Sequence, residues 1–298
     1  MNRSVLPYVI LFVGVLIAST SSILITGALN LSIAPLTVAA GRIVLASLIL
    51  TPIAWGWKGA ELRQVSRRDL GLAALAGISL AIHFASWTSS LAYTSVASST
   101  ALVTTNPVFV SLATWLILRE RMGWGSWLGV LITVAGSALI ALSDSSGGGS
   151  NPLLGDGLAL FGAITVTGYL LLGRSLRTRI SLLPYIWLVY TTCALVLLVV
   201  IALTGQSLLG LPPLGYLLIL GLALGPQLLS HTSFNWALKY LSPTLVAVSI
   251  LGEPIGSTIL AVLIFKQELR PLQMAGGAVL LIGIAVATLA ESRRPDDP

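Results

Sequence analysis

The chain has 298 residues, of which 56% are hydrophobic and 9% are charged. Soluble globular domains carry about 25% charged residues, so this composition excludes an ordinary soluble domain and indicates a protein that lies in a lipid bilayer. The formal net charge of +6 does not indicate nucleic-acid binding, because the basic residues of a membrane protein gather in its cytoplasmic loops.

Ten apolar stretches approach the roughly 20 residues that a helix needs to cross a bilayer. A membrane β-barrel would instead show alternating segments of about ten residues. We therefore predict an all-α membrane protein with ten transmembrane helices. In chain order the predicted spans cover residues 7–26, 34–54, 70–91, 97–118, 125–143, 153–173, 183–204, 213–236, 243–265 and 271–290.

The basic residues predict how these helices are oriented. When the N-terminus is placed in the cytoplasm, nearly all Lys and Arg residues outside the spans fall in cytoplasmic loops, and Lys266 and Arg270 face outward. An even number of spans returns the C-terminus to the side of the N-terminus. We expect a multi-pass protein of the cytoplasmic (inner) cell membrane with both termini in the cytoplasm.

The chain divides near its midpoint into two related halves, residues 1–146 and 147–298. A segment rich in Gly and Ser at 143–151 has the composition of a flexible linker. Each half holds five spans, an odd number, so the second half crosses the membrane in the opposite direction and a site is expected between the two repeats. A shift of about 147 positions pairs Tyr93 with Tyr240, Pro107 with Pro254, Gly129 with Gly276 and Gly136 with Gly283.

These repeated positions resemble the EamA type of the drug/metabolite transporter superfamily. The resemblance implies ten transmembrane helices in two inverted five-helix repeats, and export of small metabolites, with the nearest likeness to amino-acid exporters, including the aromatic amino-acid branch. Many relatives carry glutamate before the proline in both halves, whereas here Asn106 stands where the second half has Glu253. The residues that carry the resemblance are Pro107 with LRER at 118–121, EP at 253–254 with KQEL at 266–269, and the paired glycines.

Polar and aromatic side chains follow one face of the third and of the eighth predicted span, at helical spacing. Polar groups in a spanning helix face protein or a water-filled cavity, so we predict that these two stripes line a substrate cavity. Hydrogen bonding between helices is the alternative explanation. The stripes consist of Ser79, His83, Trp87 and Ser90 on the third span, and of Gln227, His231, Phe234 or Asn235, and Leu238 on the eighth.

Three further side chains lie deep in predicted spans. Arg42 is charged within the second span, so it needs backbone carbonyls, a carboxylate of the protein or a carboxylate of the substrate. Tyr169 and Tyr190 lie deep enough to stack against an apolar or aromatic substrate, although filling of the core would explain them equally.

Glu253 and Pro254 are neighbours inside the ninth span. Proline removes a backbone hydrogen bond, so Pro107 and Pro254 are predicted to interrupt their helices near the midplane and to act as hinges. Glu253 is a candidate for proton coupling and for substrate binding, as a group that is neutral in a dry state and ionised in a wet one. A protonated or Arg42-paired structural role is the alternative. Asn106 is a substrate-binding candidate at the equivalent position.

Stripes of small residues predict close packing of helices. Small side chains recur every four positions in the first and fifth spans. They are Gly14, Ala18, Ser22 and Thr26 in the first, and Gly129, Thr133, Ser137 and Ala141 in the fifth.

The sequence contains no HExxH motif, no nucleophile elbow and no paired acidic metal motif, and its two histidines lie in different halves. We therefore expect no enzyme activity, no catalytic residue, no metal and no cofactor. The leading hypothesis is a secondary transporter that exports small metabolites, above all aromatic or neutral amino acids, by alternating access. Its expected partners are the small-molecule substrate, membrane lipid and protons as a candidate coupling ion, and the oligomeric state is left open. The alternative is a non-transporting membrane sensor of small molecules or a scaffold.

Overall fold

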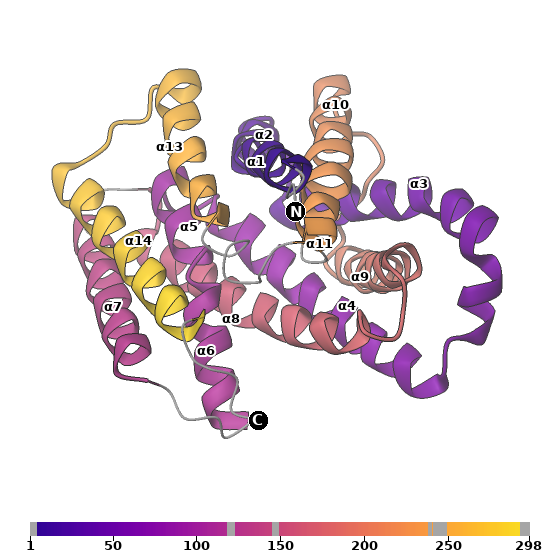
Figure 1. Ribbon diagram of the computed structural model, residues 1–298. Helices are drawn as coiled ribbons and strands as arrows, with labels where there is room; N and C mark the ends of the chain where they lie inside the picture. The colour runs from indigo at the N-terminus through magenta and orange to yellow at the C-terminus, as the bar shows by residue number, and fades with distance from the viewer. Residues whose placement is uncertain (1–4, 118–122, 145–148, 238–239, 241–248, 293–298) are drawn as a thin grey trace.

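Every regular element in the described part of the computed structural model is a helix (Figure 1). The structure describes residues 5–117, 123–144, 149–237, 240 and 249–292. Within these residues, six helices are long and apolar enough to cross a membrane, and four shorter apolar helices accompany them. The predicted all-α membrane fold is confirmed, and the helices agree with the ten predicted spans.

The elements follow the predicted spans in order. The first half contains α1 (Leu6–Ala18), α2 (Ser21–Asn30), α3 (Pro35–Gln64), α4 (Arg67–Ser90), α5 (Val96–Val103), α6 (Asn106–Ile117) and α7 (Trp124–Asp144). The second half contains α8 (Pro152–Leu176), α9 (Leu182–Leu203), α10 (Pro213–Leu222), the π-helix η1 (Ala223–Ser230), α11 (His231–Ala237), α13 (Gly252–Phe265) and α14 (Pro271–Ser292). Leu238 and the beginning of the ninth predicted span, up to residue 248, lie outside the described residues.

Local sequence signals explain where several helices begin. Proline, whose missing N–H costs nothing in a first turn, is the first residue of α3, α8, α10 and α14. Ser66 and Ser95 accept hydrogen bonds from the backbone N–H three residues ahead, at 3.1 and 3.0 Å, and so cap α4 and α5. Each cap satisfies a donor that has no partner inside the helix.

Helix α3 ends ten residues beyond the span predicted for it, which ends at residue 54. The helix continues to Gln64, with a kink at Lys58, where φ is −135°. The extra segment ends in polar and charged residues with good helix propensity, which a search for apolar spans does not detect. The excess is therefore a polar continuation of a membrane helix.

Three of the spans are interrupted within the described residues. The first breaks between α1 and α2, where Ser19 donates to the Val15 carbonyl at 3.0 Å. The fourth breaks between α5 and α6, where Thr105 donates to the Leu102 carbonyl at 2.7 Å. Each of these carbonyls also accepts the backbone N–H of the same residue, so the hydroxyl adds a second hydrogen bond next to the break. In the eighth span the π-helix contains Pro226, which cannot donate a backbone hydrogen bond.

The breaks lie just ahead of the two prolines that were predicted to interrupt helices. Pro107 is the second residue of α6, directly after the turn at Thr104 and Thr105. Pro254 is the third residue of α13, after a turn at Leu251. Proline fits in the first turn of a helix, so the bend falls before it. Whether either break works as a hinge stays a prediction.

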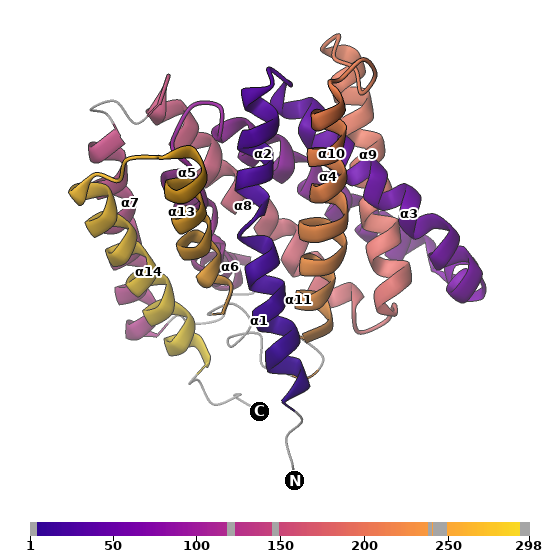
Figure 2. The same cartoon turned by 90° about the horizontal axis from the view of Figure 1, so that it is seen from above.

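Helices of one half pack against helices of the other. The pairs α7 with α14, α4 with α8, and α3 with α9 make the most extensive contacts. Helix α4 packs on the first helix of the second half, and α10, η1 and α11 pack in the same way on α1 and α2. Figure 2 shows α7 beside α14 and the start of α1 on the same side of the bundle as the end of α14. The two halves therefore share one interdigitated interior.

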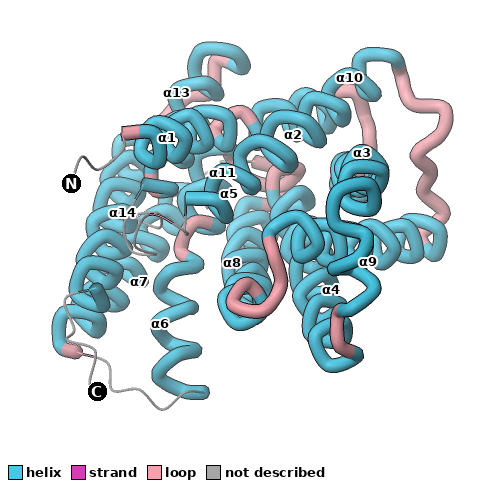
Figure 3. Tube along the Cα trace, turned by 45° about the vertical axis from the view of Figure 1, so that its right-hand side comes forward, coloured by secondary structure: helices cyan, strands magenta, loops and turns pink. Residues whose placement is uncertain are grey.

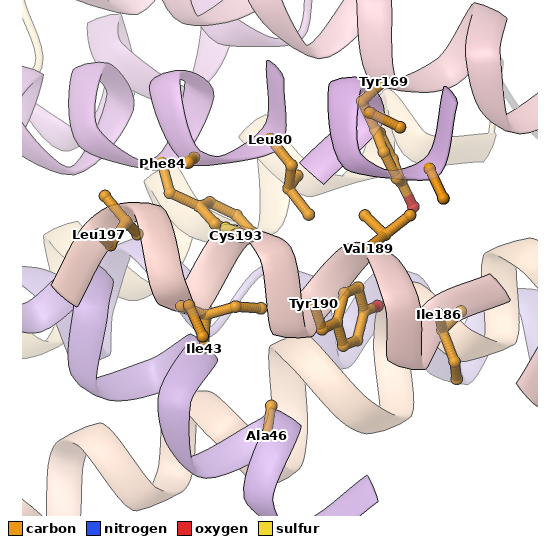
Figure 4. Packing of buried hydrophobic residues seen from close by; sticks show 14 of the residues in the cluster. Ile43, Ala46, Leu80, Phe84, Tyr169, Ile186, Val189, Tyr190, Cys193 and Leu197 are labelled. Atoms are coloured by element: carbon orange, nitrogen blue, oxygen red, sulfur yellow. The ribbon is translucent and has the colours of Figure 1, made fainter. Parts of the chain in front are cut away.

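The largest core cluster lies between α3, α4, α8 and α9. Figure 4 shows Ile43, Leu80, Phe84, Val189 and Cys193 packed together, and all five are buried. Residues 204–212 form the loop that leads from α9 to α10 (Figure 3). This loop reaches back to α3, where Thr37 donates to the Gln206 side chain at 3.1 Å.

Glycines allow α7 and α14 to approach each other closely. A Cβ atom built on Gly136 would lie 2.6 Å from the Leu280 Cα atom, and one built on Gly283 would lie 2.6 Å from Thr133 Oγ1. Both distances are shorter than real Cβ contacts. The predicted packing role of the small residues in the fifth span is confirmed for Gly129 and Thr133, which face α14.

Replacement of Gly283 by leucine should destabilise the protein, because the new side chain would collide with α7. Overpacking of this kind costs about 1–3 kcal/mol. The control is Gly277→Leu on the same helix, where an added Cβ atom meets no other atom within 4 Å. Thermal unfolding of the detergent-purified protein, followed by circular dichroism, measures the difference. Equal midpoint temperatures for both variants would contradict the packing argument.

Candidate functional site

Arg42 lies fully buried in α3, where helices of both halves meet. Its guanidinium donates to Gln227 Oε1 at 2.9 Å and to Ser21 Oγ at 3.4 Å. It also lies 4.3 Å from the centroid of the Phe84 ring. Side chains from α2, α3, α4 and η1 therefore converge on one positive charge. We call Arg42, Ser21, Phe84 and Gln227 the Arg42 cluster.

The partners that the structure gives Arg42 differ from the backbone carbonyls and carboxylates that the sequence analysis expected. They are an amide, a hydroxyl and an aromatic ring, and the ion pairs within the described residues join Lys58 to Glu61 and Arg179 to Asp69. Glu253 lies within electrostatic range of Arg42, but the two form no ion pair in this conformation of the described chain. The charge of Arg42 is thus held by neutral groups.

Phe84 joins the two predicted polar stripes. The His231 ring contacts the Phe84 ring edge-on, with centroids 6.3 Å apart, and His83 lies on the other side at 5.2 Å. His83 also stacks on Trp87 at 5.9 Å. An aromatic bridge thus runs from α4 to α11 beside the guanidinium.

Hydrogen bonds hold parts of both stripes to neighbouring helices. His83 Nδ1 lies 2.9 Å from the Gly162 carbonyl oxygen of α8. Ser90 shares a 2.6 Å hydrogen bond with Ser99 of α5, and Asn235 donates to the His231 carbonyl within its own helix at 2.8 Å. The structure therefore places Gln227 and His231 beside the Arg42 cluster, and gives Ser90 and Asn235 structural partners elsewhere.

Tyr190 and Tyr169 lie at different distances from the Arg42 cluster. Tyr190 is fully buried beside the Gln227 side chain. Tyr169 stacks on Tyr185, with ring centroids 6.5 Å apart, and faces Asn235. Tyr190 thus adds a hydroxyl to the cluster, whereas Tyr169 belongs to an aromatic pair between α8 and α9.

The residues that begin α6 and α13 are half-buried. Asn106 is the first residue of α6 and Glu253 the second of α13. The Glu253 side chain forms no hydrogen bond and no ion pair with another described residue. Its carboxyl group lies within electrostatic range of Arg42 but has no fixed partner there. Its role in proton coupling stays a prediction.

Two members of the Arg42 cluster escaped the sequence analysis. Ser21 sits in a run of four small hydroxyl residues, and Phe84 sits in an apolar helix, so neither stands out from its neighbours. The π-helix had a signal, the Gly225–Pro226 pair inside an apolar span. Among the described residues no three His, Cys, Asp or Glu side chains gather as metal ligands. The site as described offers hydrogen bonds, a positive charge and aromatic faces.

The sequence profile of the EamA-like transporter family matches this chain twice, at residues 5–142 and 153–289. The chain belongs to the EamA-like transporter family. The two matches cover most of the chain, one in each half. The helices of the first match pack against the helices of the second. This EamA-like protein is therefore a multi-pass membrane transporter by family.

Individual relatives agree with this assignment. The chain is 27% identical to the "Inner membrane protein YtfF" of Escherichia coli, with 86% of this chain and 87% of the relative aligned. It is 21% identical to an "Uncharacterized transporter" of Clostridium kluyveri, over 85% and 83% of the two chains. A solved crystal structure superposes with a TM-score of 0.64 at 19% identity, covering 98% and 99% of the two chains, and shows the fold alone. These names give no substrate.

Replacement of Phe84 by leucine should weaken the cluster, because it removes the ring that lies over Arg42 and contacts His231. A desolvated cation–π contact is worth about 2 kcal/mol. The matched control is Phe161→Leu, since Phe161 is exposed on α8. The free energy of unfolding, measured in a detergent titration, should fall for the first variant and stay nearly unchanged for the second. Equal losses would mean that the ring over Arg42 contributes no more than a surface ring.

Proposed function

We propose that this protein is a secondary transporter of the cytoplasmic membrane that exports small metabolites, above all aromatic or neutral amino acids, by alternating access. The observation that carries the proposal is the Arg42 cluster, a buried charge and its polar partners at the contact between the two halves. Ionisable groups inside membrane spans are costly and mark substrate or ion pathways. In transporters built from two repeats, the substrate site lies at such a contact.

The interrupted helices support the same proposal. Spans one, four and eight each contain a break, and α13 begins after a turn. Discontinuous helices at the interface of two repeats expose backbone groups that bind solutes and allow one half to move relative to the other. Ser21 and Gln227 of the Arg42 cluster lie in these interrupted spans.

Contacts at one end of the bundle agree with the predicted order of the spans. Arg179 pairs with Asp69 at 3.2 Å, and Ser181 donates its backbone N–H and its hydroxyl to Glu61. These contacts join two loops that the positive charges place in the cytoplasm. The residues named here therefore lie on one side of the bundle, as the topology requires.

The chemistry around the cluster favours a solute with a polar head and an aromatic or apolar body. Arg42, Gln227 and Glu253 supply charge and hydrogen bonds, whereas Phe84 and Trp87 supply flat apolar faces. Aromatic side chains stack well on such faces. Amino acids fit this combination, and a sensor would bind the same solutes without moving them.

Purified protein in liposomes should move neutral or aromatic amino acids with saturable kinetics, because alternating access limits flux to the rate of conformational change. Uptake of radiolabelled amino acids, across a panel and against protein-free liposomes, measures this. Binding of an amino acid without flux would favour the sensor, and neither binding nor flux for any member of the panel would contradict the proposed substrate class.

If Glu253 carries the coupling proton, Glu253→Gln should abolish the response of amino-acid flux to an imposed pH gradient while exchange of substrate continues. Glutamine keeps the shape of the side chain but does not titrate in this range. The matched control is Glu268→Gln in the exposed segment between α13 and α14, which should keep the wild-type response. A pH response that survives in the Glu253 variant would rule out this role.

A further inference from the structure

The hydrogen-bond donors of Arg42 are not all used. A guanidinium carries five N–H donors and accepts no hydrogen bond. Arg42 uses Nη1 toward Ser21 and Nη2 toward Gln227, but its Nε is buried and donates to no group of the described chain. The fork of the guanidinium therefore keeps an open donor at a place without access to bulk water.

The side chains next to Arg42 add further unused donors. Gln227 gives its carbonyl oxygen to Arg42, which leaves its buried amide nitrogen without an acceptor. The Tyr190 hydroxyl lies beside Gln227 without a well-aligned hydrogen bond, and the Ser230 hydroxyl, one helical step from Gln227, is also unpaired within the described residues. An unpaired buried donor is costly, so unused donors from three elements indicate a missing acceptor.

The charge balance points to the same missing partner. Arg42 is fully buried and has no ion pair with any described residue. An uncompensated charge inside a protein is strongly destabilising, and an arginine fork matches a carboxylate with two parallel hydrogen bonds. The group that would satisfy both the charge and the donors is a small anion with two acceptor oxygens.

We infer that Arg42, Gln227 and Tyr190 form a binding site for a carboxylate group, and that this carboxylate belongs to the transported solute. The inference rests on the proposed transport function and names the recognised part of its substrate. The Arg42 guanidinium supplies the charge, and the Gln227 amide and the Tyr190 hydroxyl supply neutral donors to the same oxygens. The Ser230 hydroxyl is close enough in the chain to Gln227 to add another neutral hydrogen-bond donor.

Phe84 and His231 close this site in the present conformation. The Phe84 ring covers the guanidinium, and the His231 ring, which is half-buried on α11, contacts the outer edge of Phe84. Glu253, within electrostatic range of Arg42, is the anion that competes with the solute for the same charge.

The test compares pairs of ligands that differ in the carboxylate. Full-length protein in nanodiscs is titrated with L-phenylalanine, with 3-phenylpropionate, which lacks the amine, and with L-phenylalaninamide, which lacks the carboxylate. Tryptophan fluorescence, to which Trp87 beside His83 contributes, reports binding. We expect the two carboxylates to bind at least tenfold more tightly than the amide. Equal affinities for acid and amide, or no saturable binding of either carboxylate, would overturn the inference.

Variants connect this preference to the named residues. Arg42→Lys keeps the charge but loses the fork, so the preference for acid over amide should fall about tenfold, the value of one strong hydrogen bond. Tyr190→Phe keeps the ring and removes one donor, so it should weaken the acids several-fold and leave the amide unchanged. It provides the test if the Arg42 variant does not fold.

The matched control is Tyr216→Phe, because the Tyr216 hydroxyl is exposed and donates to the Leu208 carbonyl, in the loop before α10. This variant should bind all three probes like the wild type. A Tyr190→Phe variant that binds the acids as the wild type does would remove Tyr190 from the site. Carboxylate-selective binding without flux in liposomes would keep the site and overturn the transport function instead.

Discussion

The need to hold a charged guanidinium inside a membrane bundle shapes the centre of this protein. Arg42 is fully buried, and its partners come from α2, α4 and η1, elements that lie in both halves of the chain. Because each partner is neutral, the guanidinium is stabilised by hydrogen bonds and by the Phe84 ring, with no fixed counter-ion among the residues that the structure describes. The helices must therefore keep their relative positions for these contacts to persist, and a movement between the halves changes the surroundings of the charge directly.

Broken helices supply the groups that this centre needs. A regular membrane helix satisfies its own backbone and offers only side chains, whereas a break changes the direction in which nearby side chains point. Ser21 begins α2 directly after the break at Ser19 and Thr20, and Gln227 follows Pro226 inside the π-helix. The hydroxyls of Ser19 and Thr105 donate to carbonyls at two of these breaks. Irregular backbone is thus concentrated where the two halves meet.

Much of the fold could be predicted from hydrophobicity, since a membrane helix must be apolar over most of its length. The eighth predicted span, 213–236, ends one residue before α11 does, and the seventh, 183–204, differs from α9 by one residue at each end. The prediction fell short where a helix left the apolar region, as at residues 55–64 of α3, and where it broke without a proline, as at Ser19. In both cases the sequence pattern carries no strong local signal.

At the candidate site, too, the sequence shows which residues are unusual in an apolar helix, and the tertiary structure shows which of them are in contact. The sequence determined that Arg42, Gln227, His231 and Glu253 are exceptional, because charged and polar side chains inside apolar spans are costly and stand out. Only the tertiary structure decided that Arg42 contacts Gln227, 185 positions away, and that Glu253 forms no ion pair with another described residue. Ser21 and Phe84 were found by their contacts alone, since a serine among hydroxyl residues and a phenylalanine in an apolar helix look ordinary until long-range packing brings them to one charge.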